Sequence, residues 1–236
     1  MKKTLLLFIT ILTVLKINAQ TSVFNNLLQK NVDKNGVVDY QLLKQDITQF
    51  NRYISYLEKT SPNKYWSTNK QKAFWINVYN AYTIKIILDN YPLKSITVIK
   101  KEGKTAWKIP FVKVGGKTYT LDYIEHEILF KNFFDPRIHV GVNCASKSCP
   151  KLANIAFTEN NIDAELTKLM NDFVNDTSKN KISEKKIQVS EIFNWFNVHF
   201  TKNGSVIDFL NTYSETKINP NAEITYLKYN WTLNGK

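Results

Sequence analysis

The sequence predicts an α+β protein, a helix-rich single domain around a small antiparallel sheet. Apolar residues recur at steps of three and four over long stretches, which is the spacing of amphipathic helices. Stretches in which apolar and polar residues alternate are short and scattered along the chain. Long helical patterns mixed with a few short strand patterns are typical of α+β domains.

The amino-terminal residues have the pattern of a secretory signal peptide. Lys2 and Lys3 precede a short apolar run, which ends at a small residue, Ala19. The run is too short to cross a bilayer comfortably, and no cysteine follows it as a lipid attachment point. We therefore expect residues 1–19 to be a signal peptide. Residues 20–236 are expected to be one exported domain, periplasmic or secreted, with no membrane span.

The net charge of +12 comes from lysine rather than arginine. Only Arg52 and Arg137 are arginines among the 32 basic residues, and the lysines are spread over the whole chain. Nucleic-acid-binding proteins usually cluster their positive charge and contact bases and phosphates with arginine. The composition therefore predicts a solvated lysine surface and no nucleic-acid partner. Weak attraction to anionic envelope polymers is the functional alternative.

Two helices are predicted in the first third of the chain. Residues 39–60 carry apolar side chains at steps of four and three, and the pair Ser61-Pro62 ends that pattern. A second helix, capped by Thr68, reaches about Leu88 before Tyr91-Pro92. Apolar side chains surround this second helix, which predicts that it is buried on all sides.

The middle of the chain combines a hairpin with a short helix. Gly115 and Gly116 separate two short alternating runs, which predicts a hairpin with a two-residue turn. The stretch LDYIEHEILF follows as a short helix, with Asp122 as its cap and Glu125 three residues further on. Residues 137–143 alternate in polarity and are predicted to form a strand.

The last third of the chain contains further helices and strands. An amphipathic helix is predicted from Ile162 to Phe173, and a short strand over residues 187–189. Residues 190–200 are expected to form an aromatic-rich helix. Residues 223–234 alternate again and are expected to form a terminal strand.

Both cysteines, Cys144 and Cys149, lie in the stretch RIHVGVNCASKSCPKL. A structural zinc site is disfavoured because the spacing is unusual, no second pair exists and only His139 lies nearby. A disulfide fits an oxidising compartment and an even cysteine count, but closing so short a loop adds only about 2 kcal/mol. A tight bridge of this kind would be strained and reducible. The disulfide stays open as an alternative, and no metal or other cofactor is expected.

A reactive thiol is the third interpretation of Cys144. The residue lies where the predicted strand ends and a small polar turn, residues 145–148, begins. Such positions often present reactive groups. Backbone N–H groups of the turn and the charge of Lys147 would favour the thiolate. A nucleophile also needs a base within hydrogen-bond reach.

Three histidines are candidates for that base. His126 is the first choice, because it lies on the short predicted helix, flanked by two carboxylates. His139 is the second, although strand alternation puts it on the opposite face from Cys144. His199 lies among aromatic residues and is expected to be a packing residue. An ordinary structural role stays open for each of the three.

Asn77 and Asn80 lie three residues apart on one face of the otherwise apolar second helix. A buried amide without partners costs about 1–3 kcal/mol, so both should meet polar groups. The backbone of a neighbouring loop is the plain alternative and is favoured. In the functional alternative, the amides line a catalytic pocket and orient a histidine or donate to an oxyanion.

Four stretches together resemble the DUF547 family, a family of unknown function. They are AFWINVYNAYTIK, TAWKIPFVKVGGKTYTLDYIEHEIL, RIHVGVNCASKSCPKL and ITYLKYNWTLN, and the resemblance covers most of residues 36–236. In the family pattern the second cysteine is often replaced by serine, which makes Cys144 the residue of interest. The residues that the resemblance implies are Trp75, Asn77, Asn80, Glu125, His126, Cys144 and the corner Ser148-Cys149-Pro150.

A papain-like or transglutaminase-like thiol hydrolase architecture is a further resemblance. In papain itself the cysteine precedes the histidine, whereas His126 precedes Cys144 in this chain. A shared architecture would therefore need a permuted topology.

The leading functional hypothesis is an exported enzyme with a thiol-dependent acyl-transfer site, an amide hydrolase or peptidase. Cys144 would attack the carbonyl, and His126 would accept the proton. Glu125, Asn77 or Asn80 would orient the imidazole, and the backbone N–H of Cys144 or Ala145 would receive the oxyanion. The residues expected to contact the substrate are Trp75, Ser146, Cys149 and His139.

Two other functions stay open. The first is a thiol/disulfide redox protein, or a protein that binds a small thiol such as glutathione, using Cys144 and Cys149. The second is a non-catalytic envelope binding protein. The expected ligand is accordingly a peptide, an amide or a small thiol.

Overall fold

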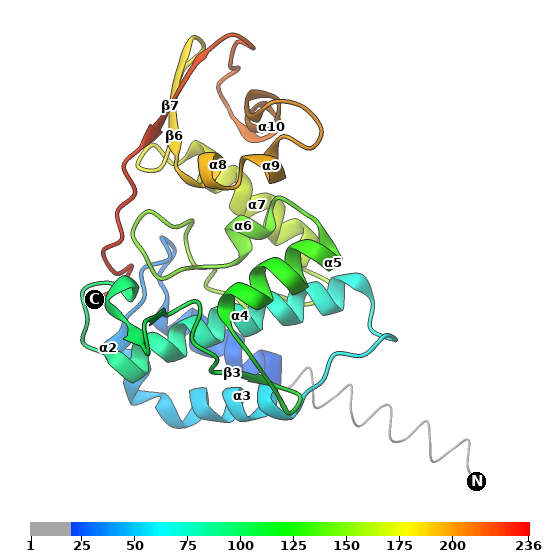
Figure 1. Ribbon diagram of the computed structural model, residues 1–236, viewed down its shortest axis with the longest axis vertical. Coiled ribbons are helices and arrows are strands. Elements are labelled where there is room, and N and C mark those ends of the chain that lie inside the picture. Colours follow the sequence, from blue (N-terminus) through cyan, green and yellow to red (C-terminus); the bar gives the residue numbers. More distant parts are fainter. Residues whose placement is uncertain (1–19) are drawn as a thin grey trace.

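The computed structural model describes residues 20–236, so the predicted signal peptide lies outside the described residues. The protein is helix-rich with small antiparallel strand pairs, which confirms the predicted α+β class. Figure 1 shows most helices in the lower and middle parts of the molecule, with the strands β6 (Lys186–Ser190) and β7 (Glu223–Leu227) at the upper end. Among the described residues, no helix has both the length and the apolar character needed to cross a bilayer.

The central element is helix α4 (Thr68–Asn90), which is buried on nearly all sides as the sequence predicts. It packs against α3 (Ile47–Lys59) and against α7 (Ile162–Asn175), which lie on different sides of it in Figure 1. Ser67, rather than the predicted Thr68, caps α4, because the Ser67 hydroxyl accepts a hydrogen bond from the backbone N–H of Lys70. The burial of α4 brings its polar side chains against neighbouring loops.

The helix predicted over residues 39–60 is interrupted at Asp46, which separates α2 (Tyr40–Gln45) from α3. The carboxylate of Asp46 accepts hydrogen bonds from Lys30 Nζ at 2.9 Å and from Asn31 Nδ2 at 3.2 Å. Both donors come from a preceding helix over residues 20–31, which the sequence patterns did not predict. These hydrogen bonds anchor the junction between α2 and α3 to that helix.

Strands β3 (Val112–Val114) and β4 (Lys117–Tyr119) form the predicted hairpin around Gly115 and Gly116. Both glycines have positive φ, 55° and 77°, as a two-residue hairpin turn requires. The turn packs against the end of α3, since the backbone N–H of Gly116 donates to the carbonyl of Glu58 at 3.1 Å.

The two turn glycines should differ in their tolerance of alanine. In Gly116→Ala the new Cβ meets open space, so the cost is the left-handed backbone alone, about 1 kcal/mol. In Gly115→Ala the Cβ would also lie 3.0 Å from Ser61 Cβ and 3.1 Å from Ser61 Cα, contacts that rotation of the hydroxyl does not relieve, and these should add about 1 kcal/mol or more. Urea denaturation of the wild type and the two variants measures how much free energy of unfolding each variant loses. Equal losses would contradict the close approach of Ser61.

Helix η2 (Tyr123–Phe130) is a π-helix, a rare form that occurs often at functional sites. The predicted cap is wrong, because Asp122 already has helical backbone angles and makes no side-chain capping bond. Thr120 takes that role, and its hydroxyl accepts a hydrogen bond from the backbone N–H of Tyr123 at 3.0 Å. The helix buries Glu125 and leaves His126 exposed.

Residues 137–143 do not form the predicted strand, because Ile138–Gly141 is the short helix α6. Polar and apolar residues alternate there, yet all four residues of α6 are buried, so the alternation does not separate two faces. Helix α6 packs closely on α7, and a Cβ on Gly141 would lie 2.8 Å from Leu166 Cδ2. The strand argument that separated His139 from Cys144 therefore does not apply.

The last third of the chain contains α7, a three-stranded sheet and several short helices. In the sheet, β6 pairs antiparallel with β5 (Lys181–Ile182) and parallel with β7. The helix predicted over residues 190–200 is divided into α8 (Ile192–Trp195) and α9 (Asn197–Phe200). The remaining elements are η1 (Ile96–Val98), β1 (Lys100–Lys101), β2 (Lys104–Thr105), α5 (Lys131–Phe133) and α10 (Val206–Tyr213).

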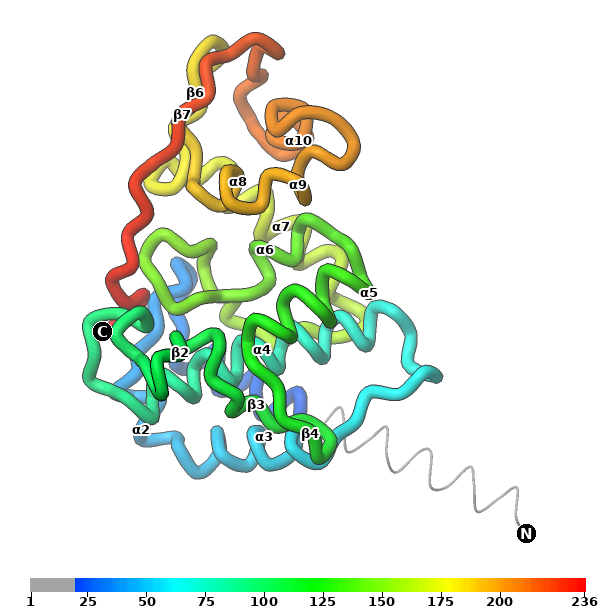
Figure 2. The backbone as a smooth tube through the Cα atoms, in the orientation of Figure 1, coloured from blue at the N-terminus to red at the C-terminus, as the bar shows by residue number. Residues whose placement is uncertain are grey.

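Strand β7 ends at Leu227 rather than continuing to residue 234, and the chain then runs down the body of the molecule, in red in Figure 2. There it binds the cysteine loop, residues 143–150. The backbone N–H of Lys147 donates to the carbonyl of Thr232 at 2.8 Å, and that of Asn234 donates to the carbonyl of Ala145 at 3.1 Å. A segment distant in sequence therefore holds the loop that carries Cys144.

Candidate functional site

A cavity of about 210 Å³ opens beside the cysteine loop, and we call it the thiol cavity. It is lined by α4, η2, α6, the cysteine loop, α8 and the chain after β7, with one residue from the loop before the β3–β4 hairpin. The side chains that line it are Tyr79, Trp107, Asp122, Glu125, His126, His139, Val142, Cys144, Cys149, Ile192, Trp195, Phe196, Tyr229 and Trp231.

The sulfur of Cys144 lies in a set of short polar contacts. It is 3.2 Å from Ser146 Oγ and 3.3 Å from Tyr229 Oη, and these two hydroxyls are themselves 3.1 Å apart. The backbone N–H of Cys144 donates to the sulfur of Cys149 at 3.1 Å. Within residues 20–236, the hydrogen-bond partners of the Cys144 sulfur do not include a histidine.

The shape of the cysteine loop is set by Asn143. Its side-chain oxygen accepts hydrogen bonds from the backbone N–H of Ala145 at 2.9 Å and from Asn234 Nδ2 at 3.1 Å, while its nitrogen donates to the carbonyl of Pro150 at 2.8 Å. Ala145 has a φ of 56°, a conformation that non-glycine residues rarely adopt. Asn143 thus stabilises a strained turn directly after the thiol.

Asn80 and Asn77 form hydrogen bonds with backbone groups and do not line the thiol cavity. Asn80 donates to the carbonyl of Gly141 at 2.8 Å and accepts from the backbone N–H of Asn143 at 2.9 Å. Asn77 makes the same pair of bonds to Phe157, at 2.7 and 2.9 Å. Both amides therefore bind the backbone of neighbouring segments, which is the interpretation favoured from the sequence. Asn80 positions the start of the cysteine loop from the buried helix.

Cys144 and Cys149 are both free thiols in the structure. The hydrogen bond from Cys149, assisted by Ser146 and Tyr229, lowers the pKa of Cys144 to about 7, although burial acts in the opposite direction. Burial and the neighbouring Cys144 raise the pKa of Cys149 well above its usual value. At neutral pH Cys144 is therefore the sulfur that carries thiolate character, and Cys149 is the donor that stabilises it.

Glu125 and His126 reach the thiol cavity from adjacent positions of η2. Burial raises the pKa of the Glu125 carboxyl, although the opposing influences of His126 and of a hydrogen bond with Tyr79 partly offset it. Tyr79 lies on α4 between the two asparagines and is fully buried. Glu125 is thus tied to the buried helix, while His126 is exposed at the mouth of the cavity.

His139 forms a pair with His199 inside an aromatic cluster. His139 Nε2 lies 2.9 Å from His199 Nδ1, and the ring of Phe130 packs on both histidines at centroid distances of 4.4 and 4.2 Å. Burial, with smaller contributions from His199 and His126, lowers the pKa of His139 well below its usual value. His139 is thus an uncharged group in the wall of the thiol cavity.

The structure brings five of the nine predicted site residues to this cavity: Glu125, His126, His139, Cys144 and Cys149. Trp75 instead packs edge-on against Tyr119 in the core, and Ser146 touches the sulfur without lining the cavity. The sequence patterns do not point to Tyr229 or to the three tryptophans in the lining. The alternation over residues 223–234 predicts a strand, and that prediction hides the contribution of this segment to the site.

Part of the chain is similar to a known protein family. Residues 63–174 match the family model described as "Protein of unknown function, DUF547". The chain carries a DUF547 region. This region supplies α4, η2 and the cysteine loop, and the chain after it supplies Trp195, Tyr229 and Trp231. No curated protein and no solved structure matches the chain. Across residues 20–236, no group of three or more histidine, cysteine, aspartate or glutamate side chains is arranged to hold a metal ion.

Proposed function

We propose that this DUF547 protein is an exported thiol-dependent acyl-transfer enzyme that hydrolyses amide or peptide bonds. The observation that carries the proposal is the position of Cys144, whose pKa is about 7, in one cavity with an exposed imidazole, His126. A thiol with a lowered pKa beside a possible proton acceptor is the arrangement that nucleophilic catalysis uses.

The proposed reaction starts with attack of the Cys144 thiolate on the substrate carbonyl. A proton held by His126 passes to the leaving amine, which departs as the acyl-thioester forms on Cys144. Water then attacks the thioester, His126 takes the proton from that water, and the acid and the Cys144 thiolate are released, so both residues return to their starting protonation states. Because His126 does not bond the sulfur, it acts on the leaving group and on water across the cavity.

The oxyanion needs a donor other than those first expected. The backbone N–H of Cys144 donates to Cys149, and that of Ala145 donates to Asn143, so both are occupied. Tyr229 is the better placed group, with its hydroxyl 3.3 Å from the attacking sulfur. Burial, with the two thiols, raises the pKa of Tyr229 far above its usual value, so its hydroxyl keeps the proton that it would donate.

A redox function is the second candidate, and one observation favours it. Cys149 lies against Cys144 and shares a hydrogen bond with it. In this function the Cys144 thiolate would attack a partner disulfide, break its S–S bond, release one partner thiol and form a mixed disulfide with the other. Cys149 would then displace that second partner thiol and form an intramolecular disulfide, so the partner disulfide is reduced by two electrons over the two steps. A non-catalytic envelope binding protein would do neither reaction.

Two acyl donors separate these functions. In single turnover, 4-nitrophenyl acetate should acetylate Cys144 once per molecule, detected as a mass increase that Cys144→Ala abolishes. His126→Ala should retain this step within a few-fold, because nitrophenolate leaves without a proton. Hydrolysis of aminoacyl 4-nitroanilides, whose amine must be protonated, should fall about 10²–10⁴-fold in the same variant. His199→Ala, outside the thiol cavity, is the matched control.

The contrary results are equally defined. Nitroanilide hydrolysis that survives in Cys144→Ala would reject the nucleophile. A wild-type protein that is not acetylated, but that reversibly loses two protons together with two electrons to a thiol/disulfide couple, would favour the redox function instead. Equal losses in His126→Ala and His199→Ala would reject the role of His126.

A further inference from the structure

The wall of the thiol cavity is unusually aromatic. Three of the five tryptophans of the chain, Trp107, Trp195 and Trp231, line it together with Tyr229. Trp231 is the centre of this aromatic wall, with ring centroids 4.6 Å from Tyr229, 5.7 Å from Trp107 and 5.9 Å from Trp195. Residues from three distant parts of the chain thus form one continuous surface beside Cys144.

Part of this aromatic wall is open to a ligand. Trp195 stacks on Trp231 with an interplanar angle of 15°, yet 48% of Trp195 remains exposed. Trp195 also lines the thiol cavity, so a ligand bound there can contact its ring. A cation placed over the face of a tryptophan ring is attracted to it.

The aromatic wall lacks the lysine side chains that are abundant in the rest of the chain. The lining of the thiol cavity includes the carboxyl groups of Asp122 and Glu125 but no lysine or arginine, although the chain has 32 of these. Its two histidines are His126 and His139, and burial lowers the pKa of His139, which keeps it uncharged. A cationic ligand would therefore meet no lysine or arginine side chain in the cavity.

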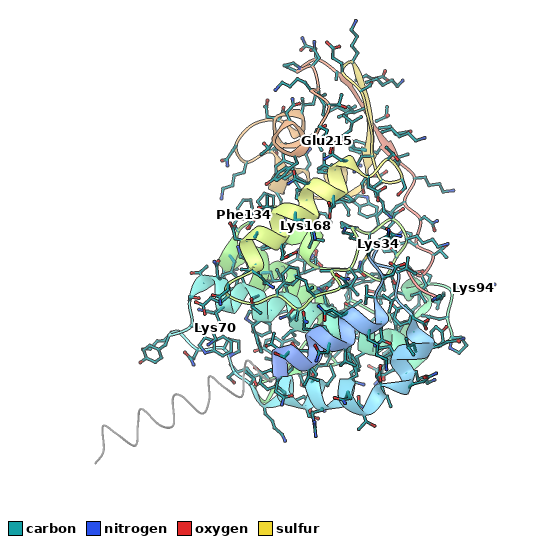
Figure 3. The ribbon with its side chains drawn as sticks, turned by 180° about the vertical axis from the view of Figure 1, so that it is seen from behind. Lys34, Lys70, Lys94, Phe134, Lys168 and Glu215 are labelled. Carbon is teal, nitrogen blue, oxygen red and sulfur yellow. The ribbon has the colours of Figure 1, made fainter. Side chains whose placement is uncertain are left out.

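A second opening differs from the thiol cavity in the charged side chains that line it. A cleft of about 990 Å³ lies on the other side of Cys149 and Tyr229, which line both spaces. Figure 3 views the molecule from behind and labels Lys34, one of the residues that line this cleft, between α7 and the chain after β7. The cleft is lined by five lysines, Lys34, Lys147, Lys151, Lys179 and Lys228, and by three carboxylates, Asp172, Asp176 and Glu215. Lysines therefore line the space on one side of the thiol, whereas the thiol cavity with its exposed indole has none.

We propose that the aromatic wall binds an alkylammonium group, so that the substrates of the thiol site are amine-bearing acyl compounds. Cations are attracted to the faces of tryptophan and tyrosine rings, and aromatic surfaces are used to bind quaternary and alkylated ammonium groups. Trp195 and Trp231 supply the ring faces, and Asp122 supplies a carboxylate at the edge. That the ligand is a substrate rests on the proposed function. The binding of an alkylammonium group to the aromatic wall does not depend on thiol chemistry.

The test measures binding with chemistry removed. A Cys144→Ser variant is titrated with choline, with its neutral isostere 3,3-dimethylbutan-1-ol and with the anion 3,3-dimethylbutanoate, and quenching of tryptophan fluorescence is followed. Choline should bind at least about fivefold more tightly than the neutral alcohol, because only the cation gains from the ring faces. The anion should bind most weakly. Equal binding of choline and the alcohol, or tightest binding of the anion, would overturn the proposal, as would no quenching by any probe.

Three further variants locate the effect. Trp195→Leu keeps an apolar side chain but removes the ring, so it should lower choline affinity about threefold or more and leave the alcohol unchanged. Trp195→Phe should recover part of the loss. Trp66→Leu, whose ring packs on Phe74 away from the cavity, is the matched control. An unchanged choline affinity in Trp195→Leu would reject the aromatic wall as the site. Choline binding together with absent nitroanilide hydrolysis in the wild type would reject the enzyme while retaining the binding site.

Discussion

In a Cys149→Ala variant, alkylation of Cys144 by iodoacetamide at pH 7 should be roughly tenfold slower than in the reduced wild type. The hydrogen bond from Cys149 is the main cause that lowers the pKa of Cys144 to about 7. Without it the pKa should return toward the usual value of about 8.5, where only a few per cent of the thiol is ionised at pH 7. The rate of alkylation against pH, followed by mass spectrometry, gives the midpoint directly.

Two variants make this result specific. Cys149→Ser keeps a hydroxyl that can donate to the sulfur, so its midpoint should lie between those of the wild type and Cys149→Ala. Tyr229→Phe removes a weaker contact and should raise the midpoint less than Cys149→Ala does. A midpoint that stays near 7 in Cys149→Ala would show that the second cysteine does not activate the first.

Mild acid should destabilise the protein through His139. Its pKa in the folded state lies well below the usual value of about 6.5, because burial disfavours the charged ring. Below pH 6.5 the unfolded chain therefore binds a proton that the folded protein does not, so the free energy of unfolding falls as pH falls. Between pH 7.5 and 5.5 the loss from His139 should be about 1.4 kcal/mol.

The His139→Phe variant isolates that contribution. Phenylalanine keeps an aromatic ring in the cluster formed by Phe130, Phe196 and His199 but cannot be protonated. Urea denaturation at pH 7.5, 6.5 and 5.5 should show a smaller loss in the variant, by about 1.4 kcal/mol over this range.

Other titrations do not obscure the comparison. Glu125, with its pKa raised by burial, acts in the opposite direction in acid, but it is common to the wild type and His139→Phe. His199→Gln should keep the larger part of the slope, since burial is the main cause of the shift at His139. Parallel pH dependences of the wild type and His139→Phe would refute the prediction.

Local sequence signals predicted those parts of the fold that local forces determine. Gly115 and Gly116 specify a hairpin through their backbone conformation, and the apolar surface of α4 specifies burial whatever the neighbours are. The prediction failed at residues 137–143, where the alternation is real but every residue of α6 is buried. Periodicity reports which face meets water, so it carries no information about a segment that meets none.

The site was predictable to the extent that its chemistry lies in one stretch of sequence. Cys144, Cys149 and His126 could be named because thiols and imidazoles are few in this chain. Tyr229 lies 85 positions after Cys144 and contacts it only because the chain leaves β7 and returns to the cysteine loop. The chain has 12 tyrosines, and nothing local distinguishes this one. Long-range pairing of this kind leaves no periodic signal.

The return of the chain after β7 determines when the surroundings of Cys144 are complete during synthesis. Tyr229 supplies a hydroxyl to Cys144, and Thr232 and Asn234 fasten the turn that follows it. A polypeptide still emerging from the ribosome, with residue 229 not yet made, cannot assemble these contacts. The surroundings of Cys144 are therefore complete only after the last residues have been synthesised and have folded back onto the turn.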